Sequence, residues 1–177
     1  MAIKEVLRSE LIPKDKPCFA FLDPNSTELD WTTVEALARY KAPADPPSSC
    51  KVELWILFNT HQAFARLIDR KHQPDYATSP RAAVMDRIMG NRDAWWDLYL
   101  DGASINRYPA RYATRLVDDL GYGFAHPQLI CDPATGAPQY FMIHASDHRA
   151  AWDFMRWAKT QSAYFDNTRP LPGMEDF

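Results

Sequence analysis

One carboxylate stands where open α/β sheets usually hold their ligands. Asp23 follows the short apolar run Cys18–Leu22 and precedes Pro24, and an apolar run that ends so abruptly is typical of a buried parallel strand. Ligands of such sheets bind outside the carboxyl ends of the strands. A carboxylate there can accept hydrogen bonds from a target amine, so Asp23 is the candidate catalytic residue. The structural alternative is a side chain that accepts from backbone N–H groups at the turn.

A second candidate site is the basic and aromatic segment 61–115. It holds nine Lys and Arg against six Asp and Glu, a local charge of +3, whereas the remainder holds eleven against seventeen, or −6. Cations contact phosphates and aromatic rings stack on bases. The candidate nucleic-acid-binding residues are therefore Arg66, Arg70, Lys71, Trp95 and Trp96. A buried aromatic core and a solvated helix face would explain the same residues.

Other site chemistries are not indicated. His144 and His148 are four residues apart, but we expect a strand at the first and a helix start near the second, so they do not share one helical face and predict no metal site. The three cysteines have no paired spacing, which favours free thiols in a reducing cytoplasm. No apolar run approaches the roughly 20 residues of a membrane span, so we expect no membrane association and a cytoplasmic location.

The elements that would position Asp23 form a crossover unit. The runs Cys18–Pro24 and Val52–Phe58 have the composition of buried strands, and a helix is expected between them up to about Tyr40. Thr32 and Glu35 have the spacing of a capping box at the start of that helix. A strand, a helix and a second strand with this spacing predict two parallel strands.

The rest of the chain predicts a helical insert and a hairpin. Residues 60–120 have mostly helical patterns, and the runs Phe124–Ile130 and Gln139–Ala145 flank a turn. We therefore expect one α/β domain at residues 1–166, with a mixed sheet of about four strands, helices on both faces and a helical insert at 60–120. A flexible Pro-rich tail is expected at 167–177.

This order of elements resembles the end of a Rossmann-like methyltransferase, in which the last strand is inserted antiparallel. The segment FLDP (Phe21–Pro24), followed by Trp31–Glu35, resembles one in the three-Cys-motif partner (TcmP) family. The segments Val52–Asn59 and Gln139–Met155 are also similar to segments of that family. The resemblance extends over about residues 5–158 and implies the C-terminal half of the methyltransferase fold.

The resemblance implies a methyltransferase-like protein that is inactive alone and acts as a partner subunit or nucleic-acid binder. The family's N-terminal half, whose Gly-rich loop holds S-adenosylmethionine, has no counterpart here, so no cofactor is expected in this chain alone. Pro24 is followed by Asn25 and Ser26, where amino-methylating relatives have a proline and an aromatic residue. One alternative is a fragment that becomes active with a donor-binding half on another chain. Another is a structural oligomerisation module.

The same half-fold predicts association with another chain. In the complete fold the strand at Cys18–Leu22 would pair with the first strand of the absent half. Here it becomes a sheet edge with unpaired backbone groups, and such edges pair readily with other strands. We therefore expect a homo-oligomer or a protein partner.

Overall fold

A computed structural model describes residues 5, 7, 12, 14, 16–25, 27–41, 51–68, 75–148, 150–153 and 157. The expected tail at 167–177 lies outside the described residues. In chain order the elements are β1 (Phe19–Leu22), α2 (Trp31–Arg39), β2 (Glu53–Phe58), the π-helix η1 (Thr60–Phe64), α3 (Ala65–Leu67), the 3₁₀ turn η2 (Tyr76–Thr78), α4 (Pro80–Met89), α5 (Trp96–Leu100), α6 (Arg107–Asp118), β3 (Phe124–Cys131) and β4 (Pro138–Ser146).

The strands form one mixed sheet in the order β1-β2-β4-β3. The pair β1 and β2 is parallel, as the crossover pattern predicted. Strand β4 runs antiparallel to both of its neighbours, β2 and β3. The prediction of an α/β fold with a four-stranded mixed sheet that ends in an antiparallel hairpin is thus confirmed.

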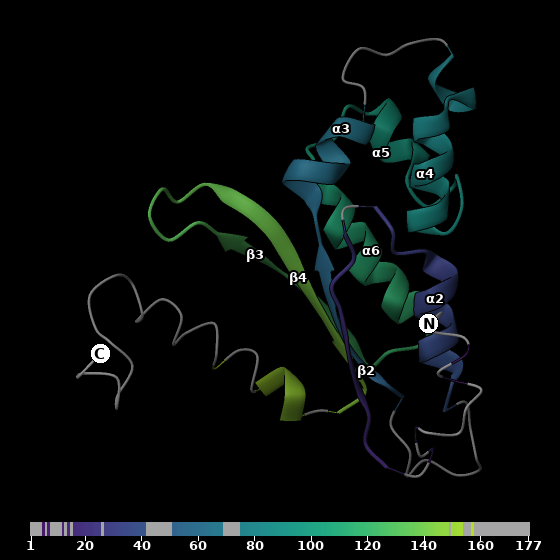
Figure 1. The fold of residues 1–177 in the computed structure, drawn as a ribbon, viewed down its shortest axis with the longest axis vertical. Coiled ribbons are helices and arrows are strands. Elements are labelled where there is room, and N and C mark those ends of the chain that lie inside the picture. Colours follow the sequence, from purple (N-terminus) through teal and green to yellow (C-terminus); the bar gives the residue numbers. More distant parts are fainter. Residues whose placement is uncertain are drawn as a thin grey trace.

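The two faces of the sheet have different cover (Figure 1). On β2 the side chains of Leu54, Ile56 and Phe58 are buried on the face toward α2 and α6, and those of the intervening residues are less buried. We call the second surface the open face. Its residues, identified from the strand register, are Phe19, Phe21, Glu53, Trp55, Leu57, Phe124, His126, Gln128, Ile130, Tyr140, Met142, His144 and Ser146.

Helix α6 lies on the covered side of the sheet, and α3, α4 and α5 lie beyond the end of β2 (Figure 1). The strong amphipathic pattern of α6 buries Tyr108, Tyr112 and Leu116, and the Tyr112 ring lies 5.0 Å from that of Phe58. On the opposite side, the short helical stretch at residues 150–153 reaches the open face through Trp152, whose ring is 5.5 Å from that of Phe124. Helical residues therefore contact both faces, but most of the open face has no helix on it among the described residues.

The predicted capping box at Thr32 and Glu35 is wrong. Helix α2 begins at Trp31, one residue before the expected cap, and the carbonyl of Asp30 accepts from the backbone N–H of Thr33 at 2.9 Å. Trp31 is buried, so burial of its large apolar ring sets where the helix begins. Glu35 instead pairs with Arg39 one turn later, at 2.8 Å.

Gly90 allows α2, α4 and α6 to meet. It follows the last residue of α4 with a φ of +97°, a conformation that disfavours side chains. A Cβ atom there would lie 2.8 Å from the Trp31 ring and 2.8 Å from the Arg115 guanidinium. Arg115 lies 4.2 Å from the Trp31 ring centre and donates to the carbonyl of Met89 at the end of α4. One cation thus caps α4 and packs on α2.

Replacing Gly90 by Ala is therefore expected to destabilise the fold more than replacing Gly102. Both glycines have positive φ, and a Cβ on Gly102 would meet nothing within 4 Å. We expect Gly102→Ala to cost about 1 kcal/mol from backbone strain, and Gly90→Ala to cost at least about 1 kcal/mol more from overpacking. Urea unfolding of the two variants measures the difference. Equal losses of stability would show that Trp31 and Arg115 can move to make room for a Cβ atom at position 90 without loss of stability.

Candidate functional site at the carboxyl edge of the sheet

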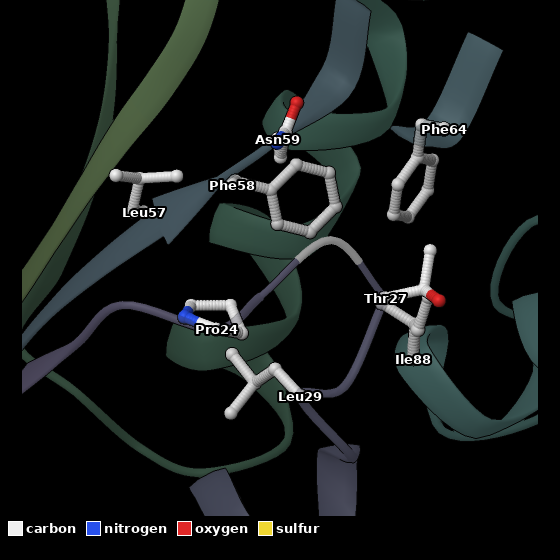
Figure 2. Close-up of a pocket in the computed structure, with 8 residues that line it drawn as sticks. All are labelled: Pro24, Thr27, Leu29, Leu57, Phe58, Asn59, Phe64 and Ile88. Atoms are coloured by element: carbon white, nitrogen blue, oxygen red, sulfur yellow. The ribbon is translucent and has the colours of Figure 1, made fainter. Parts of the chain in front are cut away.

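The carboxyl ends of β1 and β2 lie at one edge because the two strands are parallel. Asp23 follows β1 at this edge, and its side chain is exposed. Behind it, Pro24 and Asn59 line a small pocket together with residues of the connection to α2 and of the helical insert (Figure 2). The remaining lining residues are Thr27, Leu29, Leu57, Phe58, Phe64 and Ile88.

Aromatic side chains nearly fill this pocket. Figure 2 shows the rings of Phe58 and Phe64 between Asn59 and the connection that carries Pro24 and Leu29. The two ring centres are 4.6 Å apart, and the free volume is about 10 Å³, enough for roughly one water molecule. Ligand pockets usually measure hundreds of cubic ångströms, so this arrangement has no room for a nucleoside.

Two polar side chains, those of Thr27 and Asn59, line the pocket. The Oδ1 atom of Asn59 is buried and has no hydrogen-bond partner among the groups that the structure describes. The sequence motif ending at Asn59 thus delivers an amide oxygen to the same edge as Asp23. The two side chains differ in access, since that of Asp23 is open to solvent. The edge can therefore present an exposed carboxylate to a ligand on the surface.

Trp95, one of the predicted base-stacking residues, lies in the core of the helical insert. It is fully buried, and its indole N–H donates to Asp86 at 2.9 Å. Arg92 donates two hydrogen bonds, of 2.8 and 2.7 Å, to the same carboxylate. Asp86 therefore links α4 to the turn that precedes α5, and these three side chains hold the insert together.

Trp96 is half-buried and stacks on other side chains. Its ring lies 5.0 Å from that of Tyr99 at an interplanar angle of 19°, and Arg92 lies 5.0 Å from the ring centre. Arg66 is exposed on α3, and the other two predicted cations, Arg70 and Lys71, lie outside the described residues. The structure thus brings Trp95 and Trp96 together at 5.4 Å, around Arg92 rather than around a surface groove.

No sequence pattern indicates the carboxylate–imidazole pair that lies on the open face. His144 Nε2 lies 2.7 Å from the Glu53 carboxylate, although the two residues are 91 positions apart. His144 is 1% exposed because the rings of Trp55 and Phe124 lie 4.9 and 5.3 Å from it. Burial lowers the pKa of His144, and the hydrogen bond to Glu53 partly opposes that shift. A neutral imidazole that donates to Glu53 follows, which ties β2 to β4.

The described residues contain neither a cluster of side chains suited to a metal ion nor a helix long and apolar enough to cross a membrane. No protein-family model, curated protein or solved structure matches the chain.

Replacing Asp86 by Ala should destabilise the protein by about 1–3 kcal/mol, since the buried Trp95 N–H and the Arg92 guanidinium would lose their acceptor. Asp93→Ala is the matched control, because Asp93 is exposed and surface changes usually stay within about 0.5 kcal/mol. Urea unfolding measures both. Equal midpoints would mean that Asp86 does not hold the insert.

The loss of stability caused by Asp86→Ala should also depend on pH. In the folded protein the Arg92 hydrogen bonds lower the pKa of Asp86. The ionised carboxylate therefore stabilises the fold fully above the pKa of about 3.9 that Asp has in an unfolded chain. This stabilisation is lost as the pH falls through the lower pKa of the folded state. The difference in stability between the native protein and Asp86→Ala should therefore be constant near neutral pH and shrink in acid.

Proposed function

We propose that this chain is a methyltransferase-like protein of the three-Cys-motif partner type that does not catalyse alone and works as a subunit of a protein complex. Three features support the proposal: the strand order, the nearly filled pocket at the carboxyl edge and the apolar open face. The third carries the most weight.

The strand order supports the resemblance to a methyltransferase half. The last strand, β4, is inserted antiparallel between β2 and β3, which is how Rossmann-like methyltransferase sheets end. Asp23 and Pro24 follow β1 at the edge where ligands of open sheets bind. An α/β architecture supports many unrelated functions, so this feature bears on ancestry more than on activity.

The open face supports a role as a subunit. Phe19 is 58% exposed and Phe21 is 52% exposed, and Trp55, Leu57 and Met142 continue the same face across β2 and β4. Contiguous apolar surface of this kind marks protein–protein contacts. Aromatic side chains are also enriched at the centres of such contacts. This apolar face is the single observation on which the proposal rests.

Nucleic-acid binding is the weaker candidate. Trp95 has its ring in the core and Arg92 is paired with Asp86, which leaves Arg66 as the exposed cation among the described candidates. A donor-binding half on another chain would pair with the edge of β1, so the fragment alternative also predicts association but adds donor binding in the complex. A purely structural module predicts assembly without donor binding.

The chain alone should not bind S-adenosylmethionine. It lacks a Gly-rich strand-to-helix turn, which would let backbone N–H groups approach the donor, and the pocket at the carboxyl edge has a free volume of only about 10 Å³. Isothermal titration calorimetry of the purified chain with the donor should show no heat of binding. A micromolar dissociation constant would contradict the proposal.

Nucleic-acid affinity, if present, should reside in residues 61–115 and weaken steeply with salt. Replacing Arg66, Arg70 and Lys71 together by Ala should reduce the slope of log affinity against log salt by about three charges' worth. Filter binding over a salt series measures the slope. Replacing Arg39, which is exposed outside the segment and paired with Glu35, serves as the control. Absence of binding at low salt would eliminate the nucleic-acid alternative.

A further inference from the structure

The sheet has two outer strands, and they differ in how well they resist pairing. Strand β3 contains Pro127, which has no N–H to donate, and its register shifts between Ile130 and Cys131. Prolines and bulges are two of the devices by which edge strands avoid pairing with other chains. Strand β1 has neither device, since its sequence is FAFL. Of the two edges, β1 is the one suited to accept another strand.

The outward backbone groups of β1 belong to its two phenylalanines. The carbonyl of Cys18 accepts from the backbone N–H of Glu53 at 2.9 Å, so Cys18 presents its peptide groups to β2. Because these groups alternate along a strand, Ala20 and Leu22 also face β2, and Phe19 and Phe21 face away from it. No strand lies on that outer side within the described part of the chain.

We propose that β1 pairs antiparallel with β1 of a second copy of this chain, about a two-fold axis that passes between the two Ala20 residues. In this register Phe19 of one copy lies opposite Phe21 of the other, and both pairs exchange N–H and C=O hydrogen bonds. A two-fold centred on Phe19 would instead require a donor from Pro17, which has none. A two-fold centred on Phe21 would place its outer bonds at Asp23, beyond the end of β1.

The side chains fit this register. Cross-strand neighbours share a face, so the exposed ring of Phe19 on each copy lies beside the partner's Phe21, and aromatic cross-strand pairs stabilise sheets. Both rings are more than half exposed in the single chain. The two-fold axis thus makes two identical Phe19–Phe21 pairs from one sequence, and this self-complementary match identifies a second copy as the occupant.

The mass of the native chain in solution tests the dimer. Size exclusion with light scattering should give twice the chain mass of 20.3 kDa, and a monomer over the micromolar range would overturn the proposal. The variants Phe19→Lys with Phe21→Lys, and Phe19→Glu with Phe21→Glu, should each be monomeric, because like charges would face each other. Mixing the two should restore the dimer mass. Retention of the native mass by either variant alone would also overturn the proposal.

The register is tested by disulfide trapping in a background with Cys18, Cys50 and Cys131 replaced by Ala. The two Ala20 Cα atoms would lie about 4.5 Å apart in a non-hydrogen-bonded pair, within the range of a disulfide. Ala20→Cys should therefore cross-link on mild oxidation. Leu22→Cys, on the same strand and face, should not, because its counterpart lies roughly 13 Å away. Equal cross-linking at the two positions would overturn the register.

This inference does not depend on the proposed function, and the two fail separately. Light scattering and cross-linking test the dimer whatever the chain binds. Calorimetry with S-adenosylmethionine tests the proposed inactivity of the chain alone, whatever its mass. Circular dichroism of the charged variants shows whether a monomer is folded, so that a loss of the dimer is not confused with unfolding.

Discussion

A sheet buries apolar surface on two faces, and among the described residues the helices α2 and α6 cover one of them. On the covered side, Leu54, Ile56 and Phe58 of β2 pack beneath α2 and α6 and form the core. On the other side, Trp152 reaches the β3 end of the sheet, while Phe19 and Phe21 at the β1 end stay more than half exposed. Apolar surface removed from water stabilises by about 25 cal/mol per Å². The exposed end of the open face therefore favours association.

The same one-sided arrangement accounts for the nearly filled carboxyl edge. The chain that leaves β2 turns at once into η1, whose Phe64 packs on Phe58. A ligand crevice at this edge would require the aromatic side chains to be smaller or to lie elsewhere. The helical insert thus completes the hydrophobic core at the place where a sheet of this kind would otherwise open toward a ligand. Exposed Asp23 is left at the rim.

Much of the fold could be predicted because it depends on local patterns. Buried strands and the crossover rule predicted β1, β2 and their parallel pairing. The start of α2 was predicted wrongly, since the polar Thr32 matched a cap while the buried Trp31 determined the start. Tertiary burial here outweighs a local signal.

The site could be predicted less well because its contacts are long-range. The sequence suggests that the ring of Trp95 could stack on a nucleic-acid base, but the ring is buried and its N–H donates to Asp86, nine residues earlier. The pair of Glu53 and His144 depends on a strand register that no local pattern specifies. The difference between the two sheet edges likewise emerges only once the order of the strands is known.

Hydrogen exchange at β1 tests the central claim, that this edge is covered by a second copy of the chain, most directly. The amides of Phe19 and Phe21 point away from β2, and that of Ala20 points toward it, so Ala20 serves as the internal reference. The account predicts that exchange at Phe19 and Phe21 is slow when the protein is concentrated and speeds up on dilution, while Ala20 changes much less. Fast exchange of the two phenylalanine amides at every concentration, or protection that dilution does not alter, would contradict it.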